Sequence, residues 1–136
     1  MTAAALPGVR HVLHTVNPDR TTPAAARRWL GPLLGGRVPA TIRDDALLVG
    51  SELVTNAIEH GPDGADVYLA ATVLEGAIEL LVHDSGAAFE TADAGPDAES
   101  GRGLLIAEAL AQITYDIRNG STEIRALIPI TKEAAS

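Results

Sequence analysis

The sequence contains no cysteine, which excludes disulfide bonds, thiolate metal sites and a cysteine nucleophile, and which suits a reducing compartment. Aromatic residues make up only 3% of the chain, so its core must be built from the aliphatic side chains that dominate the 46% of hydrophobic residues. Basic residues are also scarce, and the formal net charge is -8. Because binding to a nucleic-acid backbone needs clustered lysine and arginine, we expect no direct contact with nucleic acid.

Long hydrophobic runs are absent too. The longest apolar stretch, VYLAATVLEGAIELLV at residues 67–82, is interrupted by Glu75 and Glu79, and it is too short and too charged to span a bilayer. The first residues, MTAAALPGVR, lack the basic region and apolar stretch of a signal peptide. The length of 136 residues fits one domain. We therefore expect a cytoplasmic single-domain protein that is not bound to a membrane.

Two helices are predicted in the first half of the chain. Residues 9–16 alternate loosely and favour a strand, after which Thr21 or Thr22 can cap a helix that ends near Leu34. A second helix is predicted from a cap at Thr41 to about residue 60, with two aspartates in its first turn. Its apolar positions are expected to form one broad buried face; they are residues 46, 47, 49, 53, 54, 57 and 58.

The second half of the chain predicts two hairpins separated by a loop and a helix. Residues 65–74 and 76–83 are rich in Val, Leu and Ile and favour a first hairpin, and residues 113–118 and 122–130 favour a second. Between them lie a long acidic loop at 85–101 and a helix from Arg102 or Gly103 to about Gln112. The predicted fold is a two-layer α/β sandwich, in which a mostly antiparallel mixed sheet is covered on one face by about three helices.

Polar residues at three places of this fold are candidates for a binding site. Glu52 and Asn56 are one helical turn apart and point the same way, although an isolated pair of this kind more often lies on a solvated helix face. Asp84 ends a strand just before Gly86, which also fits a simple strand stop. In ESGRGLL, residues 99–105, two glycines open a helix after the loop, an arrangement that can bind phosphate through backbone N–H groups.

The order and spacing of these motifs resemble the GHKL (Bergerat) ATP-binding superfamily, and within it the short anti-sigma factor serine/threonine kinases of bacteria. ELVTNAIEHG at 52–61 is similar to the N-box of that superfamily. VHDSG at 82–86 is similar to its first glycine box, and GRGLL at 101–105 to its second. GST at 120–122 is similar to the segment that ends the nucleotide pocket. The resemblance covers nearly the whole chain, 1–136, and implies one ATP-binding domain.

The resemblance assigns a role to each candidate near the metal and the adenine. Asn56 would coordinate Mg²⁺ through its carbonyl oxygen, and Glu52 would act as the general base or position the attacking hydroxyl. Asp84 would hold the adenine amino group with help from Thr122, and Gly86 would let the base approach.

The resemblance also implies how the triphosphate is held. The backbone amides of Gly101, Gly103 and Leu104 would face the phosphates, and the loop at 85–101 would form a lid over ATP. Arg102 fits two roles equally well, a phosphate contact or a solvated helix start. Arg27 and Arg28 lie outside this pocket and fit either a solvated helix edge or a surface for a partner.

Two functions follow from the resemblance. The first is an anti-sigma factor kinase that binds a sigma factor and phosphorylates a STAS-domain anti-anti-sigma protein with Mg-ATP, commonly as a homodimer. The second is a binding module of the same fold that holds a protein partner and has weak or no catalytic activity. The second is favoured by Ala88, which stands where the family often has its second glycine, and by the four carboxylates of the predicted lid.

Overall fold

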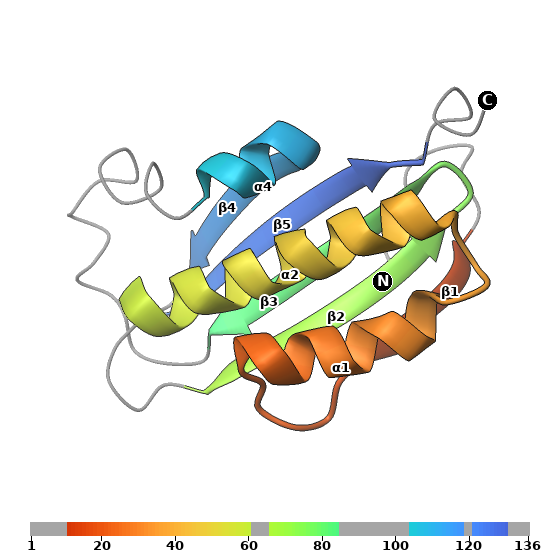
Figure 1. Cartoon of the computed structure of the whole chain (residues 1–136). Helices are drawn as coiled ribbons and strands as arrows, with labels where there is room; N and C mark the ends of the chain where they lie inside the picture. Colours follow the sequence, from red (N-terminus) through yellow and green to blue (C-terminus); the bar gives the residue numbers. More distant parts are fainter. Residues whose placement is uncertain (1–10, 61–65, 85–103, 119–120, 131–136) are drawn as a thin grey trace.

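The computed structural model describes residues 11–60, 66–84, 104–118 and 121–130. Their elements, in chain order, are β1 (His11–Val16), α1 (Pro23–Leu34), α2 (Ala40–His60), β2 (Val67–Leu74), β3 (Ala77–Asp84), α4 (Leu105–Leu110), β4 (Gln112–Arg118) and β5 (Ser121–Pro129). This order agrees with the predicted one, and Figure 1 shows the helices lying over the sheet, with α2 running along the strands.

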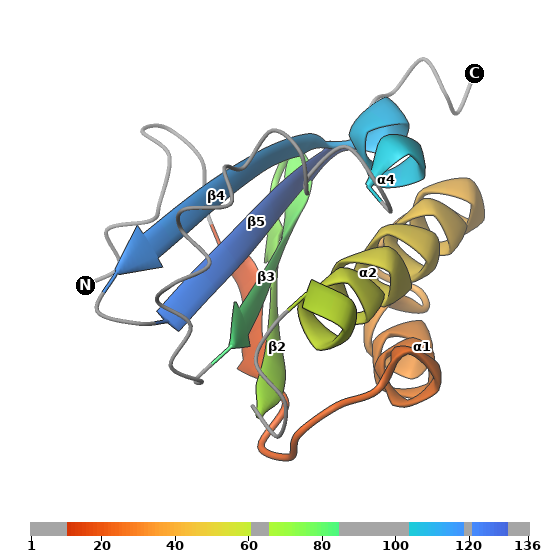
Figure 2. The same ribbon diagram turned by 90° about the vertical axis from the view of Figure 1, so that its left-hand side faces the viewer.

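The strands form one five-stranded sheet in the order β1-β2-β3-β5-β4. Every neighbouring pair among the described strands is antiparallel. Seen along the sheet, the three described helices all lie on one of its faces (Figure 2). The predicted two-layer α/β sandwich is therefore confirmed, and β3 lies at the centre of the sheet beneath α2.

The alternation of side chains along β3 explains why the helices cover only one face. Ile78, Leu80 and Val82 are buried on the helix side, whereas Glu79 and His83 point to the other side and remain partly exposed. The buried hydrophobic side chains of the described residues are all Ala, Val, Leu or Ile. This confirms the aliphatic core that the low aromatic content predicts.

The two threonines before α1 have different roles. Thr22 caps the helix, because its Oγ1 accepts a hydrogen bond from the backbone N–H of Ala25 at 3.1 Å. Thr21 is buried, and its backbone N–H donates to the carbonyl oxygen of Val67 at 2.9 Å. The sequence left both threonines open as caps, and the structure assigns the cap to Thr22 and the contact with β2 to Thr21.

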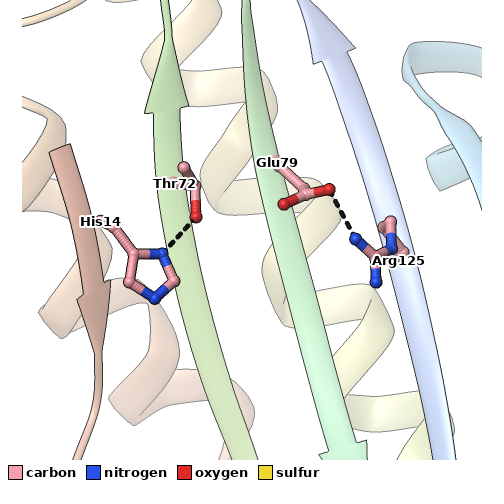
Figure 3. Close-up of polar contacts among 4 residues, drawn as sticks. All are labelled: His14, Thr72, Glu79 and Arg125. Carbon is pink, nitrogen blue, oxygen red and sulfur yellow. Dashed lines mark hydrogen bonds and ion pairs between the residues drawn. The ribbon is translucent and has the colours of Figure 1, made fainter. Parts of the chain in front are cut away.

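The uncovered face of the sheet carries polar pairs that bridge neighbouring strands. His14 Nδ1 lies 2.6 Å from Thr72 Oγ1, and Arg125 donates to Glu79 at 2.7 Å (Figure 3). The Glu79 side chain is only 14% exposed, so this ion pair is shielded from water more than an ordinary surface pair. These contacts connect β1 with β2 and β3 with β5 on the face that has no described helix over it.

The predicted start of α2 was two residues too late, about half a helical turn. The backbone N–H of Arg43 donates to the carbonyl oxygen of Pro39 at 2.9 Å, so the helical hydrogen bonds begin at Pro39 and the helix begins at Ala40. Thr41 consequently lies inside the helix and does not cap it. Asp44 and Asp45 lie beyond the first turn, where the helix dipole has little effect on them.

Two further details of the helices differ from the prediction. Ile58 was expected on the buried face of α2 but is 47% exposed, because it lies about 140° around the helix from Leu53. Helix α4 ends at Leu110, because Ala111 is already extended and Gln112 pairs with Leu127 of β5. None of the helices in the described residues is long and apolar enough to cross a membrane.

Candidate functional site

The flank of α2 that carries Glu52 and Asn56 faces away from α1. Gly50 touches α1, since a Cβ built on it would lie 2.8 Å from Leu30 Cδ1. Glu52 follows two residues later and is therefore turned about 200° around the helix, toward the side on which α4 lies. Figure 1 shows α2 between α1 and α4, and α2 contacts both helices. Glu52 is half-buried at this position.

Asn56 is more deeply buried than the sequence predicted. It was expected on the polar side of the helix, opposite the core, but it is only 6% exposed. Its spacing explains this, because Asn56 follows Val49 by seven residues and Leu53 by three, which places it at the rim of the buried stripe. This spacing was the signal in the sequence that could have predicted the burial.

The buried carboxamide of Asn56 is incompletely bonded within the described part of the chain. Its Nδ2 atom is buried and has no hydrogen-bond partner. The two ends of a carboxamide exchange places by a flip, so one polar end of this side chain is available to a ligand. An unpaired buried polar group costs about 1–3 kcal/mol. A buried polar side chain that has no structural partner is a good candidate for binding Mg²⁺, or a water molecule that bridges to a phosphate.

Asp84 and Thr122 are brought together by the pairing of β3 with β5. They are directly opposite each other in the register of the two strands. Their neighbours Val82 and Ile124 are also opposite each other and are buried under the helices, so Asp84 and Thr122 lie on that same face. Asp84 is 4% exposed and Thr122 is half-buried. The two residues predicted to contact adenine thus form a neighbouring pair.

The end of the sheet formed by Asp84 and Thr122 is also the end at which α2 terminates. Figures 1 and 2 both show the His60 end of α2 beside the final residues of β3. Helix α2 contacts β2, β3 and β5. Asn56 lies one turn before the end of α2, so it approaches the same edge as Asp84. The structure therefore places Asn56, Asp84 and Thr122 toward one end of the sheet, with Glu52 one helical turn before Asn56 on α2.

The predicted phosphate-binding segment is described only at its last residue. Leu104 directly precedes α4, and its carbonyl oxygen accepts a hydrogen bond from the backbone N–H of Glu108 at 2.8 Å. Its side chain is completely buried and anchors the start of α4 in the core. The remaining predicted positions, which are Gly86, Gly101, Arg102, Gly103 and the loop at 85–101, lie outside the described residues.

Histidine and carboxylate side chains do not assemble a metal centre in the part of the chain that the structure describes. Mg²⁺ in nucleotide sites usually takes one or two protein oxygens and fills its other positions with phosphate oxygens and water. A single carboxamide from Asn56 fits such a site, provided that a nucleotide supplies the other ligands.

Comparison with known proteins gives a consistent result for the fold. A family model described as the histidine kinase-like ATPase domain matches residues 2–128. No curated protein matches the chain. Among solved structures, the chain is similar to the blue-light activated histidine kinase of Erythrobacter litoralis EL346, with a TM-score of 0.59 and 18% identity over 83% of this chain and 42% of that one.

The histidine kinase domain of the same protein gives a TM-score of 0.55 at 18% identity, over 83% of this chain and 63% of that one. The chain therefore spans less than two thirds of either solved structure. At this level of identity the likeness concerns the fold, and it leaves the substrate and the partners to be argued from the residues of this chain.

Proposed function

Because the chain belongs to the family of histidine kinase-like ATPase domains, we propose that it is an anti-sigma factor serine/threonine protein kinase. In this proposal it binds a sigma factor and uses Mg-ATP to phosphorylate a STAS-domain anti-anti-sigma partner. The observation that supports the proposal best is the buried carboxamide of Asn56, whose Nδ2 has no hydrogen-bond partner among the described residues. Asn56 lies one turn from Glu52 and toward the same end of the sheet as Asp84. The N-box and glycine-box motifs of the sequence support the subfamily.

Each residue has a task that its position allows. Asp84 and Thr122, opposite each other on β3 and β5, would hold the adenine, and the carbonyl oxygen of Asn56 would hold Mg²⁺. Glu52 lies one turn before Asn56, about 6 Å away between Cβ atoms, and is half-buried. From there it would accept the proton of a serine or threonine hydroxyl or orient it toward the γ-phosphate.

A basic surface supports the part of the proposal that concerns protein partners. Residues 20–43 contain five arginines and no Asp, Glu or Lys, within a chain whose net charge is -8. Arg27 and Arg28 on α1 are exposed, and Trp29 between Arg28 and the buried Leu30 packs partly on the core. Arg20 is paired with Asp66 at 3.0 Å and Arg43 lies 3.7 Å from Asp44. Two neighbouring exposed arginines on α1 attract an acidic partner surface. We propose that the α1 side of the molecule meets the sigma factor, away from the nucleotide residues.

The second candidate is a binding module that holds its partner with weak or no phosphoryl transfer. Ala88 replaces a glycine of the family pattern, and the predicted lid carries Glu90, Asp93, Asp97 and Glu99. Carboxylates near a triphosphate repel it unless they point outward or Mg²⁺ screens them. This candidate uses the same arginine-rich surface and differs from the first only in catalysis.

The deciding experiment measures ATP affinity with and without Mg²⁺, labelled phosphate on STAS-domain proteins, and sigma factor binding in the same preparations. Glu52→Gln keeps the shape of the side chain and removes the base. Glu59→Gln, an exposed residue seven positions later on α2, is the matched control. A homodimer, which the subfamily favours, would be detected by sedimentation in these samples.

For a kinase, Glu52→Gln should lower phosphoryl transfer by about a hundredfold or more, which is the usual range for a general base. ATP and sigma factor binding should persist, since other residues hold them, and Glu59→Gln should behave as the wild type. The binding module would be established instead by two results together. The wild type would transfer no phosphate to any STAS partner, and Glu52→Gln would bind a partner as tightly as the wild type does.

A further inference from the structure

The end of the sheet opposite to the nucleotide residues contains a pocket of about 540 Å³. It lies where the β2–β3 turn, the end of β5 and the junction between α4 and β4 meet. Its walls are mainly apolar and come from Leu74, Ala77, Leu110, Leu127 and Pro129. The polar side chains on its rim are Glu108 and Gln112. None of the residues that line it belongs to the predicted ATP site.

Small residues and a short helix keep this pocket open. Gly76, Ala109 and Ala111 line it at positions where larger side chains would fill it, and a Cβ added to Gly76 would meet no atom within 4 Å. The turn is held in place, because the backbone N–H of Ile130 donates to the carbonyl oxygen of Gly76 at 2.9 Å. The pocket is a hollow that is open to solvent, because Gly76, Ala109 and Pro129 in its lining are exposed.

The chemistry of the lining defines what would fit. A volume of about 540 Å³ lies within the range of pockets for small ligands, which are typically apolar with a few polar groups that orient the ligand. Glu108 is exposed and forms no ion pair with another described residue. None of the described residues that line the pocket is basic. A carboxylate at the rim of an apolar hollow, in a chain of net charge -8, favours a cation with an apolar body.

We propose that this pocket binds a small apolar molecule that carries an ammonium group, with the apolar body against Leu74 and Leu127 and the ammonium group at Glu108. The site is distinct from the proposed nucleotide site. Strand β3 runs from Ala77 at the pocket to Asp84 at the other end, and eight residues of extended chain separate the two sites by about 25 Å. Binding here therefore does not depend on the proposed kinase function.

The position of α4 gives the pocket a regulatory potential. Glu108 and Leu110 of α4 line the pocket, and the same helix begins just after Leu104, at the end of the predicted phosphate-binding segment. If the proposed nucleotide site is correct, a ligand that fixes the position of α4 would change the affinity of that segment for phosphate. This consequence rests on the proposed function, so the test measures occupancy of the pocket directly.

The test uses three probes of equal chain length, which are hexylammonium, hexanol and hexanoate, and follows the backbone amides by NMR. Hexylammonium should cause saturable shifts at residues 74–77, 108–112 and 127–129, with a millimolar dissociation constant, as expected for so small a probe. Hexanol should bind more weakly and hexanoate weakest. Hexanoate binding as tightly as hexylammonium, or shifts that are spread over the molecule without saturation, would overturn the proposal.

Two variants test the assigned contacts. Glu108→Gln should weaken hexylammonium binding about threefold, the effect of one exposed charge pair, and leave hexanol unchanged, whereas Glu59→Gln should change neither. Ala109→Phe, at an exposed helix position, should fill the pocket and abolish the shifts from all probes. Equal effects of Glu108→Gln and Glu59→Gln, or full probe binding to a folded Ala109→Phe variant, would show that the ligand does not occupy this pocket.

Discussion

At one end of the sheet the same strands bury polar side chains, and at the other end they surround an apolar hollow. Asp84 and Asn56 are almost completely buried toward the first end. Ala77 and Pro129 line the pocket at the second end, where the start of β3 pairs with the end of β5. Between the two ends the helix-facing side chains are aliphatic, as Leu80 and Ala126 illustrate.

This contrast separates residues that stabilise the fold from residues that are candidates for binding a ligand. The aliphatic middle of the sheet supplies the burial that favours folding. Buried polar groups at the first end oppose folding unless they are paired, and the carboxamide of Asn56 has an unpaired nitrogen. At the second end, apolar side chains such as Leu127 line a hollow that is open to solvent. Each end therefore departs from the packing of the middle, and each departure identifies a candidate site.

The largest effect is expected at Asp84. Replacing it by Ala should weaken ATP binding by about a hundredfold or more, because a hydrogen bond between a buried carboxylate and the adenine amino group would be lost. Asp84→Asn keeps the size of the side chain and separates loss of the carboxylate from any loss of packing. Isothermal titration calorimetry on variants with wild-type circular dichroism gives the answer.

Glu108→Gln at the opposite end is the control for Asp84, and it should leave ATP affinity unchanged. If a folded Asp84→Ala protein binds ATP as tightly as the wild type, Asp84 has no place in the nucleotide site. In that case its burial would have to be explained by structure alone.

A second effect, on stability, is expected at Asn56. Asn56→Leu replaces an incompletely paired buried carboxamide by an apolar group of similar volume, and should raise the free energy of unfolding by about 1 kcal/mol. The same change should abolish the dependence of ATP affinity on Mg²⁺. Urea denaturation and calorimetry measure the two effects separately.

The matched control for Asn56 is Thr55→Val on the same helix, at a half-buried position on another side of the helix. It should alter neither property by much. A large loss of stability in Asn56→Leu would instead assign Asn56 a structural role, because it would mean that the carboxamide makes stabilising hydrogen bonds in the folded protein.

The fold was predictable because its elements are local and strongly patterned. The alternation of Ile78, Leu80 and Val82 predicts β3, and turn residues at both hairpins predict which strands pair. The start of α2 was not predictable from capping preferences, because Thr41 is a good cap by type but the helical hydrogen bonds begin two residues earlier, at Pro39. A difference of two residues at a helix end is within the usual variation of helix boundaries.

The candidate site was predictable only in part. The motifs identify Glu52, Asn56, Asp84 and Thr122 as a set, but the pairing of Asp84 with Thr122 depends on the register of β3 and β5. Sequence reasoning missed the pocket at the other end entirely. Small residues such as Gly76 give no periodic signal, so a hollow that they leave becomes visible only when the chain is folded.

The smallest effect is expected at Gly76, in the turn that borders the pocket. A Cβ there meets no atom within 4 Å and the backbone lies outside the left-handed region, so Gly76→Ala should raise the free energy of unfolding by about 0.5 kcal/mol through the unfolded state. Gly36 is the matched control, because its Cβ would also meet no atom but its φ is +81°, and Gly36→Ala should cost about 1 kcal/mol. Urea unfolding of both variants measures the difference. If Gly76→Ala were as destabilising as Gly36→Ala, the space around Gly76 would be occupied in solution, and the hollow at this end of the sheet would not be open.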